Sequence, residues 1–136
     1  MKQLTAIVIG AGNRGADAYA SYALAYPKEL KIMGVAEPHS IRRENLVISH
    51  KIPKNYEYDD WKEILEQPKF ADIAIITTQD KMHYEPAMKA MQLGYHILLE
   101  KPMATTEEEC RNLVKTSEET GVILQICHVL SWDDFV

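Results

Sequence analysis

Three glycines near the N-terminus, Gly10, Gly12 and Gly15, have the spacing G-x-G-x-x-G. They follow a continuous apolar run at residues 4–9 and open an alanine-rich segment that is predicted to be a helix. In such a unit the first glycine permits a tight turn, the second lets a pyrophosphate approach the backbone, and the third lets the helix pack closely on the strand. The free N–H groups at the start of the helix attract an anion. The glycines alone are a weak signal, and the alternative is a glycine-rich turn without a ligand.

An acidic residue, Glu37, ends the second predicted strand, 22 residues after Gly15. Dinucleotide-binding domains place an acid there to bind the hydroxyls of the adenosine ribose. A carboxylate also repels a 2′-phosphate, which favours NAD over NADP. Arg42 and Arg43 are an opposing feature because arginine binds phosphate well, but we expect both to lie on a helix and point to solvent. The lysine and Ser/Thr of a P-loop are missing, so a site for phosphate alone is disfavoured.

Polar residues follow the third and fourth predicted strands as well. They are Thr77, Thr78, Gln79 and His83 after the third strand, and Glu100 and Lys101 after the fourth. The carboxyl ends of parallel strands share one edge of a sheet, where ligands bind. A lysine there could orient a substrate hydroxyl and stabilise the negative charge that develops as a hydride leaves. The alternatives are a surface lysine after a strand and a surface histidine that leads a helix.

Five short apolar runs alternate with helical patterns. The expected strands are residues 4–9, 31–36, 71–77, 96–99 and 122–127, and the expected helices are residues 13–26, 41–50, 60–66, 86–93 and 106–121. Asp59 and Asp60 offer an N-cap, Thr106 and Glu109 form a capping box, and Gly94 is a helix stop. This alternation predicts an α/β fold with a doubly wound parallel sheet in a single domain.

Composition and charge exclude several classes of protein. The chain has 136 residues, of which 46% are hydrophobic and 26% charged, as in a globular domain. A net charge of −5 without a dense Lys/Arg run disfavours nucleic acid, and apolar runs far shorter than ~20 residues predict no membrane span. Cys110 and Cys127 have no C-x-x-C spacing, which is typical of reduced thiols in a cytoplasmic protein. No metal-ligand spacing is present, so we expect no metal site.

With these motifs the chain resembles the Gfo/Idh/MocA oxidoreductases, which act mostly on sugars, inositols and related polyols. The resemblance rests on "GAGNRG" at residues 10–15, on Glu37, on Thr-Gln followed by His83, and on "GYHILLEKPMATTEEE" at residues 94–109. The E-K-P at residues 100–102 is the most specific piece. The resemblance covers nearly the whole chain and implies the family's N-terminal NAD(P)-binding Rossmann domain, with NAD as the expected cofactor.

The resemblance implies a role for each matching residue. The pyrophosphate would meet Gly10, Gly12, Asn13 and Arg14, and Glu37 would hold the adenosine ribose. The path to the nicotinamide ribose would be lined by Thr77, Thr78, Gln79 and His83. Glu100 and Lys101 would lie beside the nicotinamide, and Lys101 would reach the substrate as the catalytic residue.

Family members also carry a second domain that binds substrate. We therefore expect the Rossmann domain at residues 1–125 and, at residues 126–136, the start of a connection to an absent C-terminal domain, so that the isolated chain does not turn over substrate. Three functions are compatible with the sequence: half of an NAD-dependent oxidoreductase for a sugar or polyol, half of a glycoside hydrolase that uses bound NAD, and a non-catalytic dinucleotide sensor. Glu100 and Lys101 favour the first two. The resemblance also allows for a homo-oligomer.

Overall fold

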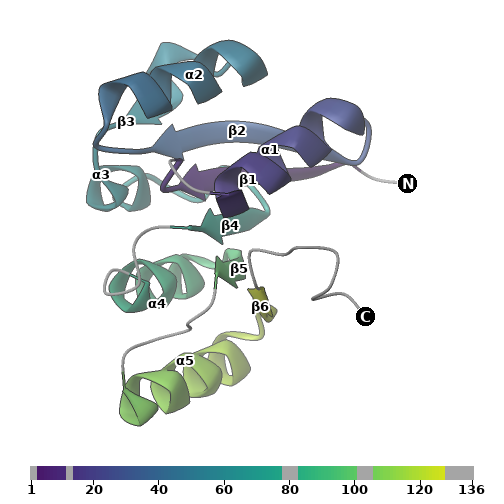
Figure 1. Ribbon diagram of the computed structural model, residues 1–136. Coiled ribbons are helices and arrows are strands. Elements are labelled where there is room, and N and C mark those ends of the chain that lie inside the picture. Colours follow the sequence, from purple (N-terminus) through teal and green to yellow (C-terminus); the bar gives the residue numbers. More distant parts are fainter. Residues whose placement is uncertain (1–2, 12–13, 78–82, 101–105, 128–136) are drawn as a thin grey trace.

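Six parallel strands form one sheet in the computed structural model, which describes residues 3–11, 14–77, 83–100 and 106–127. The strands are β1 (Leu4–Ile9), β2 (Leu30–Ala36), β3 (Glu57–Tyr58), β4 (Ile73–Ile76), β5 (His96–Glu100) and β6 (Leu124–Cys127). Their order in the sheet is β3-β2-β1-β4-β5-β6 (Figure 1). The order reverses between β1 and β4, and ligands bind at such a switch point, beyond the carboxyl ends of the strands.

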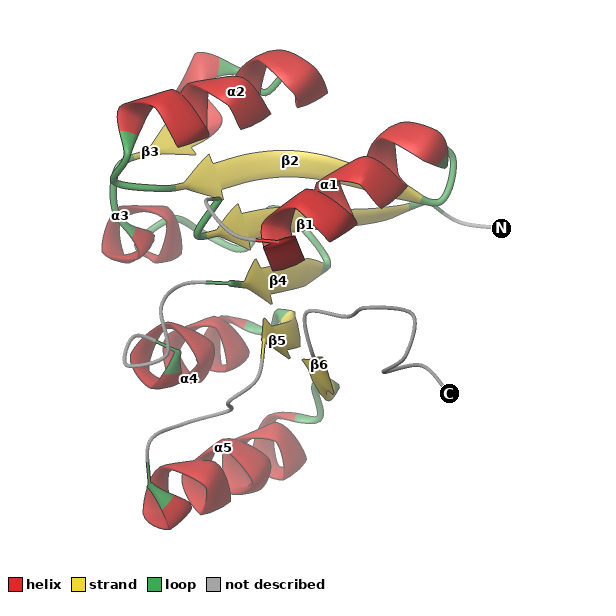
Figure 2. Cartoon of the chain, in the orientation of Figure 1, coloured by secondary structure: helices red, strands yellow, loops and turns green. Residues whose placement is uncertain are grey.

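Helices cover both faces of the sheet, as the predicted fold requires (Figure 2). They are α1 (Arg14–Ala25), α2 (Ser40–His50), α3 (Trp61–Leu65), α4 (Tyr84–Leu93) and α5 (Glu107–Thr120), with a short 3₁₀ turn, η1, at Lys54–Tyr56. Side chains of α1 and α2 pack in one hydrophobic cluster, and those of α3, α4 and α5 pack in a second one. The prediction of a doubly wound α/β domain is therefore confirmed.

The central strand β1 is buried on both faces. Ile7 and Ile9 belong to the cluster under α3, α4 and α5, whereas Ala6 and Val8 belong to the cluster under α1 and α2, and all four are fully buried. A strand in this position needs apolar residues at consecutive positions, which is why its sequence runs apolar without alternation.

Helix boundaries follow the sequence signals. The side chain of Asp60 accepts a hydrogen bond from the backbone N–H of Lys62 at the start of α3, and Thr106 Oγ1 accepts one from Glu109 N at 3.1 Å at the start of α5. Gly94 ends α4 with a φ of 97°, in the left-handed region that glycine adopts without strain. These predicted caps are confirmed. In addition, no described helix is long and apolar enough to cross a membrane.

Two features of the sheet differ from the prediction. The strand β3 was missed because its two residues form no apolar run. In addition, β2 contains a bulge: Ala6 pairs with Ile32 but Ile7 pairs with Gly34, so Met33 is an extra residue. The bulge lets a seven-residue strand pair with a six-residue neighbour.

Candidate dinucleotide site

The glycine-rich turn begins at the carboxyl end of β1. Gly10 has a φ of 91°, which a residue with a side chain rarely adopts, and its N–H donates to the carbonyl of Ala36 at 2.9 Å. Ala11 follows and is buried. Gly12 and Asn13 lie outside the described residues, and of Arg14 only the backbone, at the start of α1, is described. The strand–turn–helix context that the motif needs is thus present.

Glu37 places its carboxylate against this turn. The residue is only 7% exposed, and its Oε1 accepts a hydrogen bond from the Ala11 N–H at 2.8 Å. Its Oε2 accepts one from the His39 N–H, also at 2.8 Å. Two backbone donors therefore compensate the charge of the carboxylate in its buried position. The predicted ribose-binding acid lies beside the predicted phosphate-binding turn.

Thr77 joins the end of β4 to the same turn across the switch point. It is 2% exposed, its N–H donates to the Ile9 carbonyl at 2.9 Å, and its Oγ1 donates to the carbonyl of Gly10. Gly10, Glu37 and Thr77 thus surround the carboxyl ends of β1, β2 and β4. These three predicted site residues come from segments that are far apart in the sequence.

His83 lies directly before α4 and is 1% exposed, so the alternative of a surface histidine is wrong. Its carbonyl accepts a hydrogen bond from Ala87 N at 3.2 Å. Glu100 is the last residue of β5 and is half-buried. Thr78, Gln79 and Lys101 lie outside the described residues, and their roles stay predictions.

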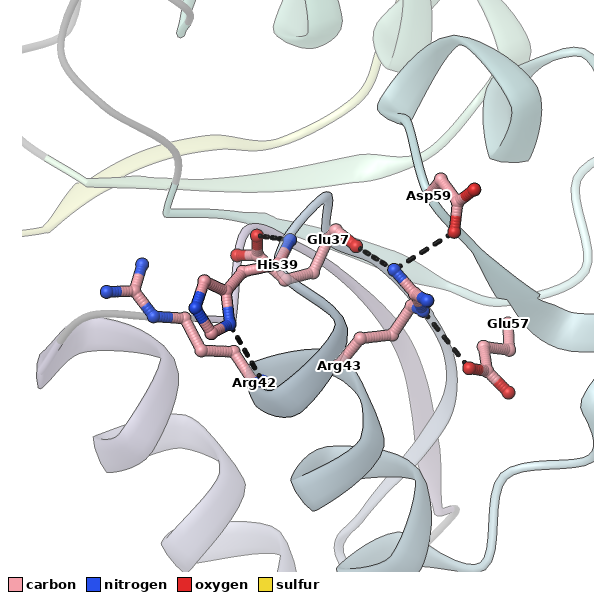
Figure 3. A network of polar contacts seen from close by, with 6 residues as sticks. All are labelled: Glu37, His39, Arg42, Arg43, Glu57 and Asp59. Atoms are coloured by element: carbon pink, nitrogen blue, oxygen red, sulfur yellow. Dashed lines mark hydrogen bonds and ion pairs between the residues drawn. The ribbon is translucent and has the colours of Figure 1, made fainter.

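Arg43 does not point to solvent, and that prediction is wrong. Its side chain is 15% exposed, with Nε at 3.1 Å from Glu57 Oε1 and Nη1 at 2.9 Å from Asp59 Oδ1 (Figure 3). Nη1 also donates to the carbonyl of Glu37 at 2.7 Å. The physical reason is that α2 packs on β2, the strand that pairs with β3, so the two carboxylates of Glu57 and Asp59 come within reach of the guanidinium. Arg42 is exposed, as predicted.

Glu57 and Asp59 are site residues that the sequence analysis missed. They lie two positions apart around Tyr58, a spacing that puts both side chains on the same side of an extended segment. This spacing was the available signal. The sequence does not show which residue these two carboxylates bind, because the pairing of Arg43 with them depends on the position of β3 in the sheet.

A surface hollow of about 530 Å³ separates α1 from α2 and begins at the glycine-rich turn. Ala11 and Arg42 line the hollow, together with Leu24 and His50. The Nε2 atom of His50 is buried and has no hydrogen-bond partner among the described residues. Burial lowers the pKa of His50. No described group of histidine, cysteine and acidic residues could hold a metal ion.

Residues 4–128 match the model of a family described as an oxidoreductase family with an NAD-binding Rossmann fold. The chain belongs to the Gfo/Idh/MocA family. It forms the NAD-binding Rossmann domain of that family, and the resemblance inferred from the motifs is confirmed.

Known Gfo/Idh/MocA relatives and neighbours differ in activity. The chain is 38% identical over 73 residues to the scyllo-inositol 2-dehydrogenase (NADP(+)) of Bacillus subtilis, matching 54% of this chain and 20% of that protein. It is 34% identical over 136 aligned positions to an α-N-acetylgalactosaminidase of Bacteroides fragilis, matching 93% of this chain and 31% of that protein. The WlbA dehydrogenase of Bordetella pertussis, solved with NADH and UDP-GlcNAcA, superposes with a TM-score of 0.82 at 20% identity and covers 93% of this chain and 36% of that one. The chain thus spans about a third or less of the length of these proteins.

Proposed function

We propose that this chain is the NAD-binding half of an oxidoreductase that moves a hydride between NAD and a sugar, an inositol or a related polyol. The observation that carries the proposal is the buried Glu37 carboxylate, which is held against the glycine-rich turn by the Ala11 N–H. Membership of the Gfo/Idh/MocA family supports it.

Different groups of residues would bind different parts of the cofactor. Gly10, Gly12, Asn13 and Arg14 would meet the pyrophosphate, and the acid Glu37 would accept hydrogen bonds from the adenosine ribose. Thr77, Thr78, Gln79 and His83 would line the path to the nicotinamide ribose. Bound NAD supplies the hydride acceptor or donor, and the protein supplies orientation and charge.

Glu100 and Lys101 would complete the site beside the nicotinamide. The Lys101 ammonium would orient a substrate hydroxyl and stabilise the alkoxide-like charge that grows as the hydride leaves. Glu100 ends β5 at the same edge of the sheet as the glycine-rich turn. In parallel α/β sheets, ligands bind at this edge, beyond the carboxyl ends of the strands.

The same geometry favours NAD over NADP. A 2′-phosphate would approach the carboxylate of Glu37, and two like charges about 4 Å apart repel by ~1 kcal/mol in water and ~4 kcal/mol at an effective dielectric constant of 20. Each ~1.4 kcal/mol is about tenfold in affinity, so a preference of about tenfold or more is expected. Arg43 does not offset this repulsion, because its guanidinium already contacts Glu57 and Asp59.

Titration of the chain with NADH and NADPH, followed by cofactor fluorescence, tests the proposal. We expect NADH to bind at least about tenfold more tightly, and Glu37→Ala to abolish the difference. Glu44→Ala is the matched control, since Glu44 is an exposed acid on α2. Equal affinity for the two cofactors in the unsubstituted chain would contradict the role given to Glu37.

A second candidate is half of a glycoside hydrolase that oxidises and then reduces its substrate on one bound NAD. The 34% identity to the α-N-acetylgalactosaminidase over 93% of this chain favours it. Assays of a full-length protein containing this domain separate the two. Substrate-dependent accumulation of NADH indicates the oxidoreductase, and cleavage of a glycosidic bond without net NADH indicates the hydrolase.

We further propose a cytoplasmic protein that takes a small-molecule sugar or polyol, does not bind nucleic acid and forms a homo-oligomer. The acidic net charge of −5 argues against nucleic acid. Cys110 and Cys127 lack C-x-x-C spacing, which is typical of reduced thiols in a cytoplasmic protein. Size-exclusion chromatography with light scattering tests the oligomeric state.

A further inference from the structure

The backbone of Glu37 is held at two points, and its side chain is held as well. The Glu37 N–H donates to the Tyr58 carbonyl at 3.0 Å, and the Glu37 carbonyl accepts from Arg43 Nη1 at 2.7 Å. The carboxylate accepts from the backbone N–H groups of Ala11 and His39. The position of the carboxylate relative to the glycine-rich turn therefore depends on the two backbone contacts of Glu37, one with Tyr58 of β3 and one with Arg43 of α2.

Arg43 is the link between those contacts. It projects from α2, and its guanidinium is enclosed by Glu57 of β3 and by Asp59, which follows β3. The guanidinium is planar, with its donors arranged as a fork, so it can contact two carboxylates and one carbonyl at once. A lysine has a single ammonium group on a flexible stem and cannot reproduce this geometry. Figure 3 shows the guanidinium between Asp59, Glu57 and the Glu37 carbonyl.

Partial burial strengthens the ion pair between Arg43 and Glu57. The Arg43 side chain is 15% exposed and that of Glu57 26% exposed, so the Nε–Oε1 pair is screened less than a surface ion pair. Asp59 is 74% exposed and contributes less. The Arg43–Glu57 pair thus fixes the guanidinium, and the guanidinium fixes the carbonyl of Glu37.

We propose that Arg43 is a positioning residue for dinucleotide binding: it acts through the Glu37 carbonyl to keep the Glu37 carboxylate against the glycine-rich turn. The claim rests on the proposed function, because it assigns Glu37 to the cofactor. Arg43 itself would not touch the cofactor. Its removal lets the end of β2 shift, which loosens the hydrogen bond from the Ala11 N–H to the carboxylate.

The test uses Arg43→Met, which keeps the aliphatic stem and removes the guanidinium, with Arg111→Met as control. Arg111 forms an exposed ion pair with Glu107 on α5, so the control removes the same charge far from the turn. We expect Arg43→Met to raise the Kd for NADH about tenfold, equivalent to ~1.4 kcal/mol, and Arg111→Met to leave it unchanged. Arg43→Lys should recover little of the loss, since charge without the fork is insufficient.

Two readouts separate positioning from a merely structural role. Amide hydrogen exchange of Ala11, measured by NMR without cofactor, should quicken in Arg43→Met at a pH where the protein stays folded. In a Glu37→Gln background, Arg43→Met should cause no further loss of NADH affinity, because both changes act on one interaction. If Arg43→Met does not fold, Glu57→Gln replaces it with an expected rise in Kd of about threefold, as one of two carboxylate partners is neutralised.

The possible results are decisive. A Kd within about twofold of the parent chain, unchanged Ala11 exchange, or additive losses in the double variant would each overturn the positioning role. If the parent chain fails to bind NADH, the proposed function falls, whereas Ala11 exchange still shows whether Arg43 positions Glu37.

Discussion

Glu37 Oε1 lies 2.8 Å from the backbone nitrogen of Ala11, so the acid at the end of β2 holds the turn that follows β1. The two residues are 26 positions apart in the sequence. The carboxylate is buried and accepts a second backbone hydrogen bond from His39. The residue proposed to bind the ribose thus also stabilises the turn proposed to bind the pyrophosphate.

Glu37→Ala is expected to lower the free energy of unfolding as well as cofactor affinity. The substitution removes the acceptor of two N–H groups, and a buried donor left without a partner costs ~1–3 kcal/mol. We expect a loss of about 2 kcal/mol in urea denaturation followed by circular dichroism. A loss no larger than that of the exposed control Glu44→Ala would show that water satisfies these donors.

Thr77 is expected to tolerate serine and not valine. Its Oγ1 donates to the Gly10 carbonyl across the switch point, and the residue is 2% exposed. Valine has nearly the same shape but no donor, so Thr77→Val should cost ~1–2 kcal/mol of unfolding free energy and weaken NADH binding. Thr77→Ser keeps the hydroxyl and should retain most of the affinity. Equal behaviour of the two variants would mean that this hydrogen bond is unimportant.

Gly34 is expected to resist substitution because of crowding. A Cβ at this position would lie 3.0 Å from Phe70 Cζ and 3.1 Å from the Tyr56 carbonyl oxygen, and the Phe70 ring is itself stacked on Tyr56 with a centroid distance of 4.6 Å. Gly34→Ala should cost ~1–3 kcal/mol. The cost should fall in a Phe70→Leu background, where a smaller side chain gives way. An unchanged cost would locate the strain at the backbone contact.

His50 is expected to make stability depend on pH. Burial lowers its pKa, so the folded protein keeps this imidazole neutral at pH values where the unfolded chain, with an ordinary pKa of ~6.5, binds a proton. Because the unfolded state then binds more protons, the free energy of unfolding should fall as pH drops below ~6.5 and level off below the lowered pKa of the folded state.

His50→Gln removes this contribution. Urea denaturation at several pH values between ~7 and ~5 should show a smaller decrease for His50→Gln than for the parent chain. The control is His39→Asn, because His39 is exposed and its cap on α2 can be replaced by an asparagine side chain. The same pH dependence in all three proteins would exclude His50 as the titrating group.

Much of the fold could be predicted from local patterns. The apolar run at residues 4–9, the cap at Asp60 and the stop at Gly94 each depend on neighbouring residues, and the structure confirms them. The strand β3 was missed since its two residues carry no pattern of their own and become a strand by pairing with Val35 and Ala36 of β2.

The candidate site was predictable in part. The glycine spacing predicts the turn after β1, and the number of residues from the glycines to Glu37 predicts that this acid follows β2. Both positions lie at the end of a buried strand, so Glu37 could be predicted to lie beside the turn. The sequence predicts that Arg43 points to solvent because it lies on a predicted helix, whereas the structure buries most of its side chain. Which residues face it depends on how α2 packs on β2 and on the pairing of β3 with β2, and no local pattern encodes that arrangement.

By itself, the sequence determined the parallel α/β class, the glycine-rich turn, the acid that faces it and the family resemblance. The fold class and the turn follow from side-chain periodicity and from the backbone freedom of glycine, both of which act over a few residues, whereas the acid and the family resemblance rest on matched motifs. Only the tertiary structure decided that Arg43 lies between Glu57 and Asp59 and holds the Glu37 carbonyl. The physical reason is that an ion pair between separate elements forms only where the sheet order and the helix packing bring the charges within about 4 Å, which is a property of the whole fold.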